Sequence, residues 1–245
     1  MLKMLSGKLH PQGLEPERPA IPRYPPFREG LPYVPVEAIL ESQDVLVSQL
    51  QQVSGLRRET FGRLLIPVLR ALADWIQLLP ASEQHHHCGA GGLFRHSLAV
   101  AVLAGRLADS VIFASDVSPL QRKECEVRWR AAVVVAALLH DGGKPLSDLV
   151  VSDAGGSQRW QPLLESLSGW TQRYALEQYY LHWRVGRGKA HEQQGLLLVP
   201  RLVPTAVLAW LTEPGQDMLQ SMLLAIGCLD LENKVSRPIL EADRL

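Results

Sequence analysis

The feature that most constrains the fold is the apolar run 131–139, which leads directly into His140. A helix that is apolar on every face is expected at the centre of a domain, because no side of it suits water. Ser118 and Pro119 are typical of a helix start, and a pair of glycines just beyond His140 is typical of a helix end. The pattern therefore predicts a central helix from Ser118 to His140, with other helices packed around it.

Apolar residues at helical spacing predict further helices on both sides of this central one. In chain order they cover about 36–53, 57–79, 93–113, 163–183, 190–212, 215–229 and 234–245. Pro67 in the second segment indicates a kink, and Pro200 and Pro204 indicate breaks in the fifth. The last helix carries no end signal, so the chain is expected to be the N-terminal part of a longer protein.

Two segments depart from the helical pattern. Residues 149–152 and 158–161 flank the turn-forming stretch 153–157, which predicts a small β-hairpin as the only sheet. Residues 1–35 hold eight of the 17 prolines, so an extended arm lying on the core is expected there. The expected organisation is a proline-rich arm at 1–35 and an all-α bundle with one small β-hairpin at 36–245.

Length, charge and cysteine content limit the class of protein. The 245 residues are 47% hydrophobic, which is enough for a substantial core. The formal net charge is zero, whereas a free-standing nucleic-acid-binding protein usually has a basic excess, so any DNA contact must be local. Three widely spaced cysteines favour a reducing cytoplasm over a disulfide framework. No signal peptide and no uncharged apolar run of about 18 residues is present, so no membrane insertion is expected.

Two sequence clusters carry potential metal ligands. The first contains the run His85–His87 and then His96, and the second is the pair His140 and Asp141. Imidazole and carboxylate groups are common ligands of first-row transition metals. Adjacent helical residues point about 100° apart, so such a pair reaches one ion only at a helix end. We interpret the clusters as two walls of one metal-dependent phosphoester site. The alternatives are a helix-capping pair, a core histidine at 96 and a solvated histidine loop.

Other side chains are candidates for holding phosphate or for closing the metal shell. Lys144 follows the His-Asp pair and is placed to hold a phosphate oxygen, although an ordinary surface lysine fits the same position. The basic loop before Glu192 is a second candidate, with a solvated loop as its alternative. Its phosphate-binding candidates are Arg184, Arg187 and Lys189.

Two further residue types complete the candidate site. His191 ends the basic loop, and Asp243 follows an apolar pair on the last helix, so each either turns inward as a ligand or stays at the surface. A tyrosine beside a metal can act as a nucleophile, although packing is the simpler role. The tyrosine candidates, all expected on the 163–183 helix, are Tyr174, Tyr179 and Tyr180.

The order of these motifs resembles a known family. A histidine, then His-Asp, then a distant aspartate on successive helices is similar to the HD phosphohydrolase superfamily. A longer string of motifs, from Arg23 to the chain end, resembles the MobH-class conjugative relaxases, the TraI proteins of integrative conjugative elements and related plasmids. These motifs are Pro-Arg-Tyr-Pro-Pro-Phe at 22–27, Gly-Leu-Pro at 30–32, Leu-Leu-Pro-Ala-Ser at 78–82, the histidines at 85–87, Gly-Gly-Leu at 91–93 and Arg-His-Ser-Leu at 95–98.

The resemblance implies nicking of one DNA strand at an origin of transfer, with a divalent metal, in the bacterial cytoplasm. The metal positions carried over from the family are His96, His140, Asp141, His191, Asp243 and the run His85, His86 and His87. We expect one or two ions of Mn²⁺ or Fe²⁺, and a coupling protein as a partner. Family members are usually longer than this chain, and no motif selects the nucleophile; Tyr179 and Tyr180 are the expected catalytic tyrosines, together with Lys144.

The expected function is therefore that of a DNA relaxase whose 36–245 segment is an HD-type metal-dependent helical domain. Two other classes of function are consistent with the residues. One is a metal-dependent phosphohydrolase acting on nucleotides, which the neutral net charge favours slightly. The other is a catalytically silent docking module that recruits a coupling or replication partner. Metal analysis separates the silent module from the two enzymes.

Overall fold

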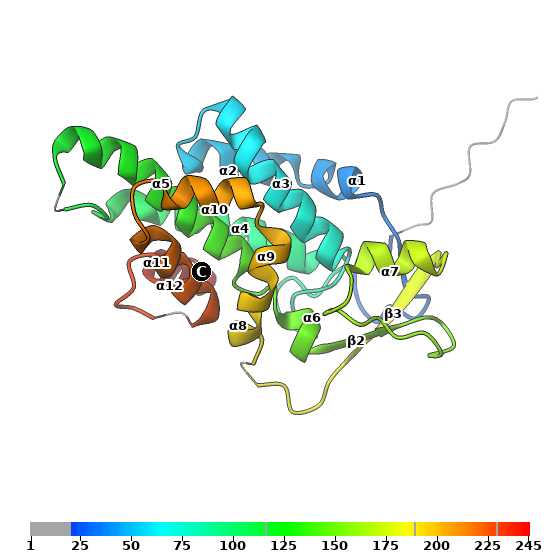
Figure 1. The fold of residues 1–245 in the computed structure, drawn as a ribbon. Coiled ribbons are helices and arrows are strands. Elements are labelled where there is room, and N and C mark those ends of the chain that lie inside the picture. Colours follow the sequence, from blue (N-terminus) through cyan, green and yellow to red (C-terminus); the bar gives the residue numbers. More distant parts are fainter. Residues whose placement is uncertain (1–20, 116, 189, 229) are drawn as a thin grey trace, which may run out of the picture.

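The computed structural model describes residues 21–245 apart from 116, 189 and 229. Helices pack into a bundle, and a small antiparallel sheet lies at one end of it (Figure 1). This confirms the predicted fold class, with a sheet larger than a hairpin. The helices in the bundle and over the sheet are α1 Val36–Glu41, α2 Asp44–Ser54, α3 Arg58–Ile76, α4 Gly92–Leu107, α5 Pro119–Leu139, α6 Lys144–Ser147, α7 Leu167–Arg173, α8 Ala190–Gln194, α9 Val199–Leu202, α10 Thr205–Thr212, α11 Asp217–Gly227 and α12 Ser236–Asp243.

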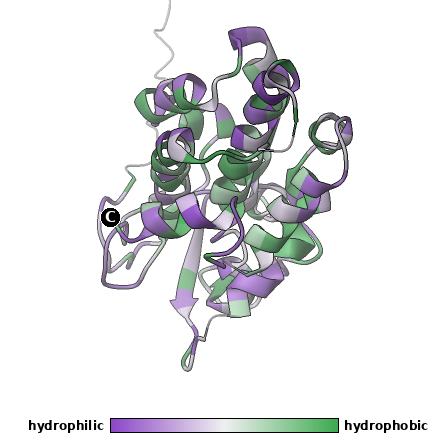
Figure 2. Ribbon diagram, turned by 90° about the vertical axis from the view of Figure 1, so that its left-hand side faces the viewer, coloured by the Kyte–Doolittle hydropathy of each residue, from purple (hydrophilic) through white to green (hydrophobic). Residues whose placement is uncertain are grey.

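Helix α5 is the central helix that the apolar run predicts. Ser118 caps it reciprocally with Gln121: each side chain contacts the backbone N–H of the other residue. Every residue from Ala131 to Leu139 is at most 2% exposed. Helices α4 and α11 pack against α5, and Figure 2 shows hydrophobic residues concentrated in the helices at the middle of the molecule. The core therefore holds the end of α5, and with it His140, in a fixed place.

The sheet has three short strands in the order β1-β3-β2, all antiparallel. They are β1 Leu31–Pro32, β2 Leu149–Ser152 and β3 Gln178–Trp183. The expected pairing of 149–152 with 158–161 forms only in part: Ser152 and Arg159 make one isolated antiparallel bridge, and beside it Asp153 N donates to Gln158 O and Trp160 N donates to Val151 O. Pro162 follows directly and lacks the N–H that a continued ladder needs. β3 offers six consecutive extended residues instead, and β2 pairs along it from Leu149 to Ser152.

The predicted helix over 163–183 is wrong in its second half. Helix α7 ends at Arg173, and the chain turns at Ala175, whose φ is 50°, before it enters β3. The segment 178–183 is rich in aromatic residues, which favour a pleated strand that packs on one face. Tyr179 and Tyr180 therefore lie on a strand and point to opposite faces of the sheet. Tyr174 lies at the end of α7.

The C-terminal third returns to the central helix. Pro204 breaks the predicted 190–212 helix, and Pro200 lies in the first turn of α9, where a missing N–H costs nothing. Helix α12 packs against α4 and α5, which brings its last residue, Asp243, beside His140. Among the described residues no single helix passes the length and hydropathy test for a membrane span; Ala190–Leu202 and Thr205–Thr212 pass it only as a pair, bent by 103°.

Candidate metal centre

Four side chains that the sequence predicts as metal ligands converge at one place. Nε2 of His96, on α4, lies 3.2 Å from Oδ2 of Asp141 and 3.1 Å from Oδ1 of Asp243. Nε2 of His140, at the end of α5, lies 3.6 Å from each of the same two oxygens. The ring centroids of His96 and His140 are 5.2 Å apart. Residues from three helices thus point their nitrogen and oxygen atoms at a common centre.

The ring of His140 is oriented by its own helix. Its Nδ1 lies 2.7 Å from the carbonyl oxygen of Ala137. A carbonyl only accepts, so Nδ1 carries a proton, and in the neutral ring that a metal requires Nε2 presents its lone pair to the cluster. Nε2 is buried and has no hydrogen-bond partner among the described residues. A buried acceptor without a partner is costly, and a metal ion would satisfy it.

The donor set also suits a metal ion. Ligand atoms of His96, His140 and Asp141 all lie within 4.8 Å of one another. Two imidazole nitrogens and a carboxylate oxygen are the donors that first-row transition metals take in proteins. The residues therefore fit the predicted divalent metal, and Asp243 lies close enough to complete the group.

The electrostatics of the cluster follow from its burial and its opposite charges. Burial opposes a charge on His96, but the carboxylates of Asp141 and Asp243 raise its pKa to about 9. Burial likewise opposes a charge on Asp141, yet His140, His96 and Lys144 hold its pKa far below the ordinary value. Contacts with His140 and His96 lower the pKa of Asp243. Both carboxylates are therefore ionised at neutral pH, as metal ligation requires.

Lys144 contacts the cluster itself. Its Nζ lies 2.5 Å from Oδ2 of Asp141 and donates to the carbonyl oxygen of Ala81 at 3.0 Å. It also lines a cavity of about 320 Å³ that includes His85 and Asp148. Its predicted contact with phosphate stays a prediction, because in this structure the ammonium group is paired with the carboxylate.

His191 approaches the other oxygen of Asp141. Its Nε2 lies 3.7 Å from Oδ1 of Asp141, and its Nδ1 lies 3.6 Å from Oδ2 of Asp148. A Cβ on Gly143 would lie only 2.1 Å from the carbonyl oxygen of His191, so the glycine makes this approach of α8 possible. The two oxygens of Asp141 thus face different histidines, an arrangement that suits a second ion.

Asp148 is a residue that the sequence analysis missed. It is 6% exposed, and Ser147 donates a hydrogen bond to its Oδ1 at 2.6 Å. Burial alone would raise the pKa of Asp148, but contacts with His191 and Ser147 outweigh burial and lower this pKa below its ordinary value. The Asp148 contact in turn raises the pKa of His191. A carboxylate behind a ligand histidine fixes the ring and strengthens the ligand. The sequence signal that could have identified Asp148 is its position, four residues after Lys144, at the end of the short helix that follows the two glycines.

Only one histidine of the 85–87 run lies against the cluster. The ring centroid of His87 is 5.3 Å from that of His96, whereas His85 and His86 are exposed. His87 has a φ of 58°, and its carbonyl oxygen packs where a Cβ of Gly92 would be, at 1.9 Å. Burial and the nearby His96 and Arg95 lower the pKa of His87, which favours the neutral ring that a metal requires.

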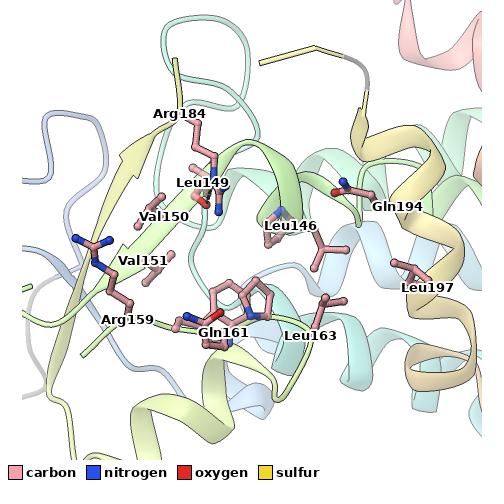
Figure 3. Close-up of a pocket in the computed structure, with 13 residues that line it drawn as sticks. Leu146, Leu149, Val150, Val151, Arg159, Gln161, Leu163, Arg184, Gln194 and Leu197 are labelled. Atoms are coloured by element: carbon pink, nitrogen blue, oxygen red, sulfur yellow. Dashed lines mark hydrogen bonds between the residues drawn. The ribbon is translucent and has the colours of Figure 1, made fainter. Parts of the chain in front are cut away.

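The predicted phosphate-binding residues separate into different places. Nε of Arg184 donates to the carbonyl oxygen of Leu149, and Arg184 lines a cavity of about 420 Å³ with mostly apolar walls, shown in Figure 3. Arg187 pairs with Glu83 at 2.6 Å and lies over the ring of Trp183. Lys189 falls outside the described residues. The phosphate role of these three stays a prediction.

The candidate tyrosines also have different surroundings. Tyr179 is fully buried, its Oη accepts a hydrogen bond from Leu78 N at 3.0 Å, and burial raises its pKa, all of which favour a packing role. The ring of Tyr180 lies against Gly30, where an added Cβ would be 3.1 Å from it. Tyr174 is 41% exposed and packs against Trp170.

The fold and the cluster define a mostly helical protein with a buried His-His-Asp group that could hold a metal ion. The chain belongs to the TraI_2 family, described as "Putative helicase", whose model matches residues 33–243. This confirms the resemblance to TraI proteins at the level of the family. No curated protein matches the chain.

Proposed function

We propose that this chain is the metal-dependent nicking domain of a MobH-class conjugative relaxase, which cleaves single-stranded DNA at an origin of transfer. The observation that carries the proposal is the convergence of His96, His140, Asp141 and Asp243, with an unpartnered buried nitrogen on His140. The family match supports the connection to TraI proteins. In the bacterial cytoplasm its partners would be the origin DNA and the coupling protein.

These four residues would hold one divalent ion, Mn²⁺ or Fe²⁺, and His191 with Oδ1 of Asp141 would hold a second. When bound, such ions polarise a phosphodiester and stabilise the charge that develops on it. The chain's own residues supply the rest. Ala137 fixes the tautomer of His140, Asp148 faces His191, and Lys144 neutralises part of the charge on Asp141.

The printed sequence contains no Gly-x-x-x-x-Gly-Lys-Ser/Thr phosphate loop, the motif of nucleotide-driven motors. The cluster, and not a nucleotide-binding loop, is therefore the part of this chain suited to phosphate chemistry. A relaxase must also conserve the energy of the broken phosphodiester, which requires a covalent protein–DNA link. Tyr180 and Tyr174 are the predicted nucleophiles whose hydroxyls are not enclosed in the core.

The test is a labelled single-stranded origin oligonucleotide incubated with protein and Mn²⁺ at low salt, then separated under denaturing conditions. Low salt is needed because phosphate contacts weaken steeply with ionic strength. We expect a slowly migrating protein–DNA adduct that disappears when Tyr180 or Tyr174 is replaced by Phe. Tyr179→Phe is the matched control, and its adduct should persist. Metal-dependent cutting without any adduct would favour water as the nucleophile and a nucleotide-type phosphohydrolase.

A further inference from the structure

A cavity of about 560 Å³ lies on the His87 side of the cluster. Its walls come from the end of the N-terminal arm, from the loop after the histidine run and from the first turn of α4. The residues that give it chemical character are Arg23, Tyr24, His87 and Arg95. No aspartate or glutamate is among the described residues that line it.

The cavity adjoins the candidate metal centre through two of its walls. The ring centroid of His87 lies 5.3 Å from that of the cluster residue His96. Arg95 is the neighbour of His96 on α4. The arm is seated closely on this region, because a Cβ on Gly89 would lie 2.5 Å from the carbonyl oxygen of Arg23. A molecule in the cavity would therefore lie beside the residues that would hold the metal.

The side chains of the cavity offer one aromatic face and two cationic groups. Tyr24 is 73% exposed, which leaves a large ring face open to a partner. Arg23 and Arg95 are both exposed, and neither forms an ion pair within the part of the chain that the structure describes. Because the whole chain has zero net charge, a cavity lined by two cations and no carboxylate is a local feature, as a local DNA contact requires.

We propose that this cavity binds a nucleotide of single-stranded DNA next to the phosphodiester that is cut. The ring of Tyr24 stacks on the base, and Arg23 and Arg95 contact the flanking phosphates. Aromatic stacking with cationic contacts to the backbone is how proteins hold single strands without reading a sequence. The identity of the ligand rests on the proposed function. Because the cavity lies beside the cluster, a strand whose phosphodiester is cut at the cluster would pass through the cavity.

The experiment measures the affinity for fluorescein-labelled oligothymidylate by fluorescence anisotropy, in low salt with EDTA so that no cleavage occurs. Tyr24→Ala should weaken binding roughly tenfold or more, because a stacked base is lost, while Tyr24→Phe should bind nearly as the wild type does. Arg23→Gln and Arg95→Gln should each weaken binding and reduce the slope of log affinity against log salt by about one. The matched control is Arg58→Gln, which removes one exposed charge on α3 and should change neither quantity.

Several results would overturn the proposal. They are unchanged affinity in Tyr24→Ala, equal losses in Arg58→Gln and the two cavity arginine variants, or no binding of oligothymidylate by the wild type. A second readout, the metal-dependent hydrolysis of bis(p-nitrophenyl) phosphate by the wild type, reports on the cluster alone. Absent hydrolysis together with DNA affinity that depends on Tyr24 and the arginines would reject the proposed function and still support the cavity.

Discussion

The indole N–H of Trp75, on α3, donates a hydrogen bond to the carbonyl oxygen of Gly142 at 3.1 Å. Both groups are buried, and Gly142 is the residue after Asp141. The bond therefore ties the turn that carries the cluster carboxylate to a long core helix. It is a direct connection between the packing of the bundle and the geometry of the candidate metal centre.

Trp75→Phe should lower the stability of the metal-free protein by about 1–3 kcal/mol, because the Gly142 carbonyl loses its buried donor. Thermal unfolding followed by circular dichroism measures the change. Trp210→Phe is the comparison, since the structure shows no hydrogen bond for the Trp210 indole among the described residues. Equal melting temperatures for Trp75→Phe and the wild type would show that the bond does not stabilise the turn.

Asp148→Asn should weaken Mn²⁺ binding about 10- to 100-fold at the position that includes His191. The carboxylate faces Nδ1 of His191, and groups behind a ligand histidine tune its affinity by this amount. Titration calorimetry measures the binding, and Asp153→Asn, a half-buried aspartate that follows β2, serves as the control. Wild-type affinity in a folded Asp148→Asn protein would remove Asp148 from the site.

Replacing His85, His86 and His87 together by alanine should abolish DNA cleavage and leave the fold intact. We expect the replacement of His87 to cause this loss, because among the three histidines only the His87 ring lies against His96. His87→Asn is the sharper variant, since asparagine tolerates the left-handed backbone at φ 58°. Cleavage should fall strongly in His87→Asn and persist in the His85→Ala, His86→Ala double variant. The reverse order of activities would contradict the assignment.

Local signals predicted much of the architecture. The apolar run at 131–139, the Ser118 cap and the glycines after Asp141 define α5 within the sequence itself, and the structure confirms them. The convergence of His96, His140 and Asp141 was predicted because the sequence indicates both where helices end and which side chains can bind a metal. Asp243 was predicted by the resemblance, and α12 brings it to the other three.

The remaining parts depend on contacts between distant segments. β3 was predicted as a helix, because its partners, β1 and β2, lie far away in the chain and no short-range pattern specifies them. Asp148 was missed for a similar reason: its role arises only when α8 returns past Gly143 and places His191 beside it. The choice of His87 among three histidines depends on one backbone turn, and sequence alone does not show that turn.

The most direct measurement is the metal content of the purified chain, determined by plasma mass spectrometry for the wild type, Asp141→Ala and the exposed control Asp217→Ala. We predict at least one transition-metal ion per wild-type chain, the same content in Asp217→Ala, and loss of most of it in Asp141→Ala. The loss is expected because Asp141 faces every histidine of the group and its removal leaves an incomplete shell. A folded Asp141→Ala protein with full metal content, or a wild type that binds none when supplied with Mn²⁺ or Fe²⁺, would contradict this prediction.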